Sequence, residues 1–338
     1  MASVLDTAAV RVETLGDPEA GPSLADEVRA GLARRPRELP PKLLYDERGS
    51  VLFDRITELP EYYPTRCERA ILNRYAPELV EAAGAEELLE LGSGVASKTR
   101  ALLYAMAGTG RLLRYLPLDV DRSVVERSAE ELTELLPGLE VHGLVGDFGH
   151  DLDGLPAPDG RRLVAFLGGT IGNLDPEGRA GLLARLRALL RPEDRLLLGV
   201  DLVKDEARLL AAYDDPQGVT REFTANALLV LNRELGADFE PAAFEPFARL
   251  DPCEQRVELG LSARTPQRVR LAALDHAELE LARGEELRTE ISSKFTRPGL
   301  ERELADAGMG VERFVCDDEG LFAVALAAPR ERAGALSG

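Results

Sequence analysis

The chain has 338 residues, of which 45% are hydrophobic, and its formal net charge at pH 7 is -19. A chain of this length and composition buries a sizeable core and has room for two structural units. The excess of acidic residues repels nucleic acid and anionic membrane surfaces, so neither is an expected partner. A small-molecule ligand is expected instead.

The cysteines and histidines are scattered along the chain, without the spacing of a metal site or of a disulfide framework. They are Cys67, Cys253, Cys316, His142, His150 and His276. No apolar run approaches the length of about 20 residues that spans a bilayer, and the first residues lack the basic and apolar regions of a signal peptide. We expect a cytoplasmic protein without a metal, with flexible tails over residues 1–19 and 331–338.

The middle of the chain alternates short apolar runs with amphipathic segments, which is the pattern of a parallel sheet covered by helices. The expected strands cover residues 87–92, 115–120, 141–147, 162–169 and 195–201. The expected helices cover residues 98–107, 123–136 and 176–190, the last with Asp175 as N-cap and Pro176 in its first turn. This pattern predicts a doubly wound, Rossmann-like α/β domain, which two strands at 311–316 and 321–327 close as a hairpin.

Two regions depart from this alternation of strands and helices. Residues 23–35 are expected to form a helix, followed up to residue 65 by an aromatic and acidic segment, and residues 205–294 to form two helices and then alternating strands. We therefore expect a Rossmann-like domain over residues 66–204 and 295–330. A second, discontinuous α+β domain over residues 20–65 and 205–294 is expected to pack over the carboxyl edge of its sheet. The segment TEISSKF, residues 289–295, lies at the return junction, and in a strand Glu290 and Ser292 share one face.

The segment LLELGSGVASKT places Gly92 and Gly94 in a turn between a strand and a helix. Small residues allow the backbone to approach a ligand there, and the helix N-terminus favours negative charge. A dinucleotide site would have a third glycine at position 97, where this chain has Ser97. The pattern E-x-G-x-G-x-A, from Glu90 to Ala96, resembles instead motif I of class I S-adenosylmethionine methyltransferases. A glycine turn that only joins a strand to a helix is the alternative.

Further candidates for the cofactor follow in chain order. Asp119 ends the second strand, where an acid accepts hydrogen bonds from ribose hydroxyls, unless it only caps the next helix. Asp147 and Phe148 end the third strand, where the carboxylate suits an adenine amino group and the ring packs on the base; Asp147 as a plain turn residue is the alternative. Lys98 is poorly placed for the helix dipole, so we expect it to contact a ligand. Together these residues predict S-adenosylmethionine.

Four stretches in this order resemble one family. They are residues 41–72, FLGGTIGNLDP at 166–176, residues 199–220 with GVDLVKD and AYDDPQGVT, and TEISSKF. The chain resembles, over residues 20–327, the histidine N-alpha-methyltransferase of ergothioneine biosynthesis, which trimethylates the amino group of histidine to give hercynine. The resemblance implies a class I methyltransferase domain, the cofactor residues Gly92, Lys98, Asp119, Asp147 and Phe148, and the substrate residues Tyr62, Asn173, Tyr213, Glu290 and Ser292, with Tyr45 and Gly168 as second-tier contacts.

The chemistry of an amino acid agrees with these substrate residues. Asn173 can donate to the carboxylate and accept from the amine, and Tyr213 can donate to the same carboxylate. Glu290 can accept an imidazole N–H while Ser292 donates to or accepts from the ring. A charge-assisted hydrogen bond of this kind contributes about 1.5 to 3 kcal/mol. In the alternative reading, Asn173 satisfies backbone groups at a turn and the tyrosines are packing aromatics.

Direct displacement of the methyl group by a neutral amine requires positioning and no metal. The sequence identifies no general base. Rival functions are a methyltransferase of the same family for another aromatic amino acid such as tryptophan, a sensor that binds S-adenosylmethionine without catalysis, and a nicotinamide dehydrogenase. Leu259, on a strand expected near the pocket, could tune the side-chain preference. Glu290 and Ser292 argue against tryptophan, and Ser97 argues against a dehydrogenase.

Overall fold

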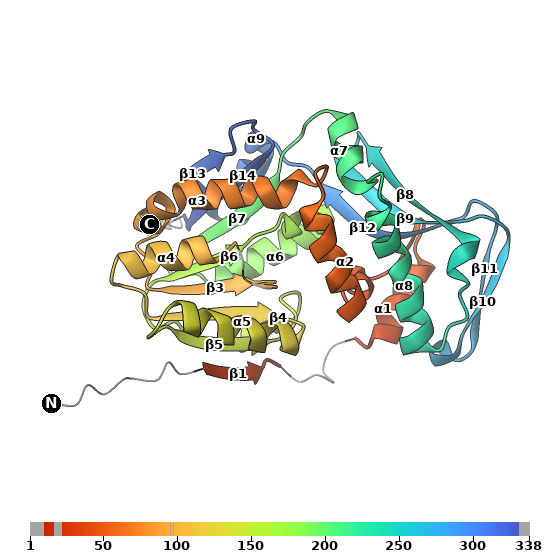
Figure 1. Cartoon of the computed structure of the whole chain (residues 1–338), viewed down its shortest axis with the longest axis horizontal. Helices are drawn as coiled ribbons and strands as arrows, with labels where there is room; N and C mark the ends of the chain where they lie inside the picture. The colour runs from red at the N-terminus through yellow and green to blue at the C-terminus, as the bar shows by residue number, and fades with distance from the viewer. Residues whose placement is uncertain (1–9, 17–21, 95, 97, 331–338) are drawn as a thin grey trace, which may run out of the picture. The chain divides into compact units, whose positions relative to one another are not determined.

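The computed structural model describes residues 10–16, 22–94, 96 and 98–330 (Figure 1). The chain divides into two compact units. Unit 1 comprises Met1–Pro18, Cys67–Leu202 and Phe295–Gly338, and unit 2 comprises Glu19–Arg66 and Val203–Lys294. Each unit is therefore built from segments that are distant in sequence.

Among the described residues of unit 1, eight strands form one sheet in the order β1-β5-β4-β3-β6-β7-β14-β13 (Figure 1). Neighbours from β1 to β7 run parallel, while β14 and β13 are antiparallel. The chain order reverses direction between β3 and β6, which is the topology of a doubly wound sheet. The strands are β1 (Val10–Thr14), β3 (Glu87–Leu91), β4 (Arg114–Asp119), β5 (Glu140–Val145), β6 (Arg162–Phe166), β7 (Arg195–Asp201), β13 (Met309–Cys316) and β14 (Phe322–Pro329). The Rossmann-like α/β prediction and the closing hairpin are confirmed.

Both faces of this sheet are buried, so its strands carry apolar residues on both sides. On β6, Val164 and Phe166 face one core cluster while Leu163 and Ala165 face the other. One cluster is covered by helices α3 (Tyr63–Ala83), α4 (Arg100–Gly108) and α5 (Arg122–Leu135), and the other by α6 (Pro176–Leu189) and α9 (Arg297–Asp306). Helices α4, α5 and α6 are as predicted, whereas α3 and α9 were missed. The interior Pro77 of α3 interrupts the sequence signal of a helix.

The predicted N-terminal tail is wrong over residues 10–16. Residues 10–14 form β1, which pairs in parallel with β5, and Val12 lies opposite Gly143 in register. The alternation of Val10 and Val12 with charged residues is the period of a short strand, and Arg122 of α5 donates to Thr14 at 2.8 Å. The rest of that predicted tail, residues 1–9 and 17–19, and the C-terminal tail, residues 331–338, lie outside the described residues.

Unit 2 combines helices with two small sheets. Its four-stranded sheet has the order β2-β12-β9-β8, and β10 pairs with β11. The predicted helix after residue 22 is confirmed as α1, and the predicted strand TEISS lies at the end of β12, where the register shifts between Arg288 and Glu290. Helix α2 was missed in the aromatic segment. The elements are α1 (Leu24–Ala33), β2 (Arg37–Glu38), α2 (Glu47–Glu58), α7 (Glu206–Tyr213), α8 (Val219–Leu235), β8 (Phe244–Asp251), β9 (Arg256–Ala263), β10 (Gln267–Leu271), β11 (Ala277–Leu281) and β12 (Glu286–Ser293).

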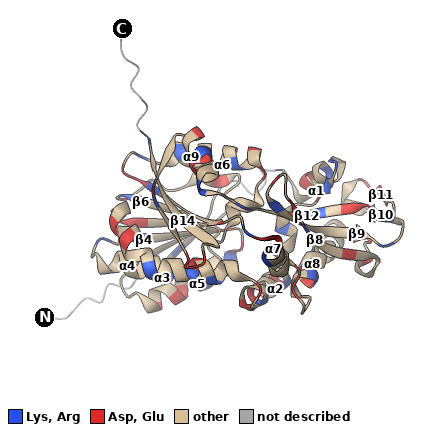
Figure 2. Cartoon of the chain, turned by 90° about the horizontal axis from the view of Figure 1, so that it is seen from above, with Lys and Arg blue, Asp and Glu red and all other residues tan. Residues whose placement is uncertain are grey.

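The surface of unit 1 carries both signs of charge, and helices α6 and α9 each have both acidic and basic residues (Figure 2). Within the part of the chain that the structure describes, no helix has the length and apolarity needed to cross a membrane.

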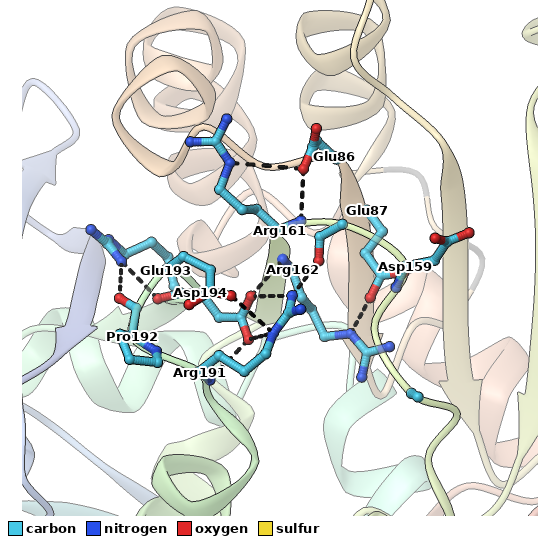
Figure 3. A network of polar contacts seen from close by, with 12 residues as sticks. Glu86, Glu87, Asp159, Arg161, Arg162, Arg191, Pro192, Glu193 and Asp194 are labelled. Atoms are coloured by element: carbon cyan, nitrogen blue, oxygen red, sulfur yellow. Dashed lines mark hydrogen bonds and ion pairs between the residues drawn. The ribbon is translucent and has the colours of Figure 1, made fainter.

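A network of buried charges joins the amino ends of neighbouring strands in unit 1 (Figure 3). Glu87, at the start of β3, is fully buried and receives hydrogen bonds from Arg162 of β6 and, at 2.6 Å, from Arg114 of β4. Asp194, also fully buried, accepts from the Arg162 backbone N–H at 2.8 Å and from the Arg191 side chain at 2.9 Å. The network therefore fixes the amino ends of the parallel strands, at the opposite side of the sheet from their carboxyl ends.

Replacing Asp194 by alanine should destabilise the protein. Burial alone would raise the pKa of Asp194, but hydrogen bonds from Arg191 and the Arg162 backbone outweigh it and hold the pKa below its ordinary value. Asp194→Ala leaves these partners unmatched, and we expect the free energy of unfolding to fall by about 3 to 5 kcal/mol at pH 7. Urea unfolding followed by circular dichroism measures this difference.

The same variant gives a pH test. A carboxylate with a depressed folded-state pKa stabilises the protein above its unfolded pKa of about 3.9 and loses that effect as the pH falls through the folded value. The difference between Asp194→Ala and the unsubstituted protein should therefore shrink between pH 5 and pH 3. Glu193→Ala, at the partly exposed neighbour, is the control, with a change below about 0.5 kcal/mol. A difference that is independent of pH would contradict a role for the Asp194 charge.

Candidate active site

The glycine loop after β3 leaves its backbone accessible. Gly92 and Gly94 have φ values of 64° and 50°, in the left-handed region that favours glycine. A Cβ atom at Gly94 would meet nothing within 4 Å, and one at Gly92 would meet only the Phe148 ring, at 3.8 Å. The Oγ atom of Ser93, between the two glycines, is buried and has no hydrogen-bond partner among the described residues. These features fit a polar ligand that approaches the loop closely; Ser97 lies outside the described residues.

Asp119 and Phe148 lie at the carboxyl ends of strands beside this loop. Asp119 accepts a hydrogen bond from the Gly94 N–H at 2.9 Å, which ties the end of β4 to the loop after β3. Burial raises the pKa of Asp119, and the bond from Gly94 acts in the opposite direction. Asp121, not Asp119, caps α5, so the capping alternative for Asp119 is wrong. The Phe148 ring packs edge-on against Phe166, with ring centroids 5.0 Å apart.

Asp147 already takes part in a turn. Its carboxylate accepts from the Gly149 N–H at 2.6 Å and lies 3.3 Å from the Nδ1 atom of His150. The backbone N–H of Asp147 donates to Asp151 at 2.7 Å. These bonds support the reading of Asp147 as a turn residue. Its second carboxylate oxygen, Oδ2, lies beside the exposed side chain of His150.

Lys98 has a protein partner that the sequence did not suggest. Its ammonium donates at 2.5 Å to Glu68, a fully buried carboxylate of α3. Glu68 also accepts from the Gly168 N–H, at 2.8 and 2.9 Å to its two oxygens. A Cβ atom at Gly168 would lie 3.2 Å from the Lys98 Nζ atom, so these groups form one compact cluster. Helix α4 begins at Arg100, and Lys98 lies in the turn before it.

In unit 2, Glu290 on β12 contacts Tyr45, which belongs to a cluster of aromatic rings. The Tyr45 hydroxyl donates to Glu290 at 3.3 Å, and Tyr45 packs edge-on against Phe53 and Phe223 at centroid distances of 5.6 and 5.3 Å. Burial raises the pKa of Glu290 to about 7, while the bond from Tyr45 and the charge of Lys294 oppose that rise. Burial and the charge of Glu290 also raise the pKa of Tyr45.

A polar trio of Tyr213, Ser292 and Lys294 also lies in unit 2. The Tyr213 hydroxyl and Ser292 Oγ are 2.8 Å apart, and Lys294 Nζ lies 2.9 Å from the former and 2.7 Å from the latter. Tyr62 packs edge-on against the Tyr213 ring at 6.2 Å. Lys294 was missed as a site residue, although the alternation that pairs Glu290 with Ser292 extends to position 294.

Five of the seven predicted substrate residues thus belong to unit 2, where they form two neighbouring groups. Tyr45 contacts Glu290, while Tyr62 and Ser292 contact Tyr213. Gly168 and Asn173 belong to unit 1, where Asn173 ends a 3-10 turn, Thr170–Asn173, after β6.

No group of three or more His, Cys, Asp or Glu residues within residues 10–16, 22–94, 96 and 98–330 is arranged to hold a metal ion. The polar groups described above are hydroxyls, carboxylates, an ammonium and backbone N–H groups. This set suits an organic ligand with ribose hydroxyls, an amino group and a carboxylate better than it suits a metal.

Comparison with known proteins agrees with this geometry. Residues 24–329 match the family model described as "Histidine-specific methyltransferase, SAM-dependent", where SAM is S-adenosylmethionine. The chain is 49% identical over 313 residues to the histidine N-alpha-methyltransferase of Mycolicibacterium smegmatis and 48% identical over 314 residues to that of Mycobacterium tuberculosis. Each match covers 93% of this chain and 97% of the relative.

A fungal relative is similar over a shorter stretch. The chain is 38% identical over 206 residues to ergothioneine biosynthesis protein 1 of Neurospora crassa, which is 60% of this chain and 23% of that protein. The family match spans nearly all of the described residues, including the glycine loop, the Glu68 cluster and β12. The chain therefore belongs to the family of histidine-specific methyltransferases that depend on S-adenosylmethionine.

Proposed function

We propose that this chain transfers methyl groups from S-adenosylmethionine to the alpha-amino group of L-histidine, in three rounds that give hercynine, as a step of ergothioneine biosynthesis. The names of the mycobacterial and fungal relatives support the reaction and the pathway. The observation that carries the substrate is Glu290, a buried carboxylate held by Tyr45 beside the polar trio. An imidazole N–H is a suitable donor for such a carboxylate.

The residues of unit 1 that fit the cofactor are Gly92, Asp119, Asp147 and Phe148. The bound cofactor supplies a sulfonium methyl group, which the neutral amine displaces directly. Asp119 offers a carboxylate oxygen to the ribose hydroxyls, and Phe148 offers a ring face to the adenine. We assign Lys98 an indirect role. It pairs with Glu68, and Glu68 in turn holds the Gly168 backbone N–H in place.

The substrate residues bind and orient histidine. Tyr213 and Asn173 donate to the carboxylate, and Glu290 and Ser292 contact the ring; Tyr62, Tyr45 and Gly168 complete the proposed set. Burial and the charge of Glu290 raise the pKa of Tyr45, which disfavours an ionised Tyr45 as the base. Positioning of this kind contributes up to about 7 to 11 kcal/mol of barrier reduction.

Tryptophan is the second candidate substrate, since Leu259 on β9 pairs with Glu290 in register and presents an apolar side chain in unit 2. The indole N–H of tryptophan can also donate to Glu290, but an indole has no acceptor nitrogen for Ser292, whereas a neutral imidazole has one, and sites built on buried hydrogen bonds strongly reject analogues that lack one of them. A sensor that binds the cofactor alone would have no use for the polar groups of β12. Both alternatives are therefore less favoured than histidine.

The function is tested by incubating the purified protein with S-adenosylmethionine and an equimolar pool of the twenty amino acids. We expect mass spectrometry to show mono-, di- and trimethylhistidine, with the other amino acids unchanged, because an imidazole N–H pairs with Glu290. Methylation of another amino acid would refute the assignment of histidine. Absence of methylation, together with cofactor binding by calorimetry, would favour a sensor.

Glu290→Gln tests the contact with the ring. The substitution keeps the size of the side chain and removes its charge, so we expect the KM for histidine to rise about ten- to a hundredfold, with the affinity for S-adenosylmethionine unchanged. Steady-state kinetics and calorimetry measure the two quantities. Glu286→Gln, on the same strand with its carboxylate paired to Arg249, is the control. Equal losses in histidine and cofactor binding would contradict the assignment.

Glu290 also predicts the pH dependence of the reaction. Its pKa of about 7 means that the carboxylate is lost as the pH falls below neutrality, and its ability to accept a ring N–H is lost with it. We expect kcat/KM for histidine to decrease below about pH 7, in addition to the decrease caused by protonation of the substrate amine. In Glu290→Gln the component near pH 7 should be absent. Identical pH profiles for the two proteins would show that Glu290 does not titrate in this step.

A further inference from the structure

We propose that Glu68 is a positioning residue that joins the segment after the glycine loop to the loop after β6, so that binding of the cofactor strengthens the binding of histidine. The inference rests on the proposed function, in which Gly168 and Asn173 contribute to the binding of histidine. Neither the sequence patterns nor the family resemblance singled out Glu68. The residues that carry the argument all belong to unit 1.

Glu68 of α3 is fully buried and binds two segments that are distant in sequence. It accepts from the Lys98 ammonium at 2.5 Å and from the Gly168 N–H at 2.8 and 2.9 Å to its two oxygens. A Cβ atom at Gly199 of β7 would overlap the Glu68 Oε1 atom, so the missing side chain there makes room for the carboxylate. One buried carboxylate therefore connects the segment before α4 with the segment after β6.

The segment before α4 is anchored at two points. Lys98 and Thr99 are consecutive, and each donates to a different buried carboxylate, Lys98 to Glu68 and Thr99 to Glu90 at 2.5 Å. The charges of Lys98 and Glu68 act on the pKa of Glu90 in opposite directions, so the three side chains interact. Because Glu90 directly precedes the glycine loop, a ligand that fixes this loop also restricts the ammonium that Glu68 binds.

The loop after β6 has backbone freedom that an anchor can restrict. Gly168 and Gly169 have φ values of 80° and 70°, and glycine loses more conformational freedom on ordering than any other residue. Gly169 is the N-cap of the 3-10 turn Thr170–Asn173, so the orientation of the Gly168 peptide determines where this turn begins. The hydrogen bond from Gly168 to Glu68 therefore restricts the loop five residues before Asn173.

A shared anchor makes the two binding events depend on each other. Since both segments bind the same carboxylate, the ligand that orders one of them reduces the free energy needed to order the other. Each ligand then has a higher affinity in the presence of the other, by the same factor, and such factors are typically at least about fivefold. Glu68 thus acts on the substrate without contacting it.

The unsubstituted protein gives the first test. Calorimetry measures the Kd for histidine alone and with saturating S-adenosylhomocysteine, the demethylated cofactor, which binds without reacting. We expect the Kd to be at least about fivefold lower with S-adenosylhomocysteine, and the ratio of the two Kd values is the coupling ratio. A coupling ratio of one would overturn the proposal.

Glu68→Gln removes the anchor and keeps the size of the side chain. The Gly168 N–H faces both oxygens of Glu68, so in either orientation the glutamine amide places its NH2 group against this donor. We expect the coupling ratio to fall below about twofold. The KM for histidine, measured with saturating S-adenosylmethionine, should rise about five- to tenfold, with kcat less affected. An unchanged coupling ratio would contradict the proposal.

Glu87→Gln is the matched control. Glu87 is also a fully buried carboxylate of unit 1, and it accepts from Arg114 at 2.6 Å and from the Asp159 backbone N–H at 3.2 Å. Its place at the amino end of β3 separates it from the glycine loop at the other end of that strand. We expect Glu87→Gln to lower the melting temperature and to keep the coupling ratio. Equal loss of the ratio in both variants would show a general structural effect and overturn the proposal.

The double variant Glu68→Gln with Lys98→Met keeps the proposal testable if Glu68→Gln alone does not fold. Replacing both charged partners together leaves no buried charge unpaired, which is far less disruptive than removing one of them. We expect its coupling ratio also to fall below about twofold, and a ratio equal to that of the unsubstituted protein would overturn the proposal. If the unsubstituted protein does not methylate histidine, the proposed function fails; if it does and the coupling ratio is one, only this inference fails.

Discussion

Burying a carboxylate is costly unless its oxygens receive hydrogen bonds, and both units are arranged around this requirement. In unit 1, Glu90 accepts from Thr99 and Tyr115, each at 2.5 Å, so one side chain ties β3 to β4 and to the N-cap of α4. Burial raises the pKa of Glu90 to about 7, and both bonds oppose that rise. Glu90, the acid of the E-x-G-x-G-x-A pattern, therefore holds the two ends of the glycine loop through Tyr115 and Thr99. The backbone of Gly92 and Gly94 stays accessible.

The same requirement has a different solution in unit 2. Glu290 is as desolvated as Glu90, with a pKa of about 7, yet the bond that it receives from Tyr45 is 3.3 Å long. The charge of Lys294 also opposes the rise of the Glu290 pKa. In our proposal an imidazole N–H adds a charge-assisted hydrogen bond to this carboxylate. In our proposal the free energy needed to bury Glu290 is thus recovered when histidine binds, which is how a buried charge becomes a source of specificity.

The sequence predicted most of what depends on local pattern. Apolar alternation identified the strands of the central sheet and β12, and the glycine spacing identified the loop after β3. It missed α3, because Pro77 interrupts the helical pattern, and it missed β1, because a short strand at an expected tail pairs only with the distant β5. It also gave no sign that Glu68 of α3 pairs with Lys98, whose contact with a ligand stays a prediction. Partners that are remote in sequence leave no local signal.

The chemistry of the proposed reaction explains why no device for counting methyl groups is needed. Each transfer to a primary, secondary or tertiary amine produces a cation, and the next transfer requires a lone pair that only proton loss restores. After the third transfer the nitrogen has no proton to lose and no lone pair, so the series ends by itself. The protein has only to hold the ring and the carboxylate while the amine changes. Contacts to those two groups, made by Glu290, Ser292 and Tyr213 in our proposal, are unaffected by the growing nitrogen. A site specific for the side chain is therefore compatible with three successive methylations at the same nitrogen.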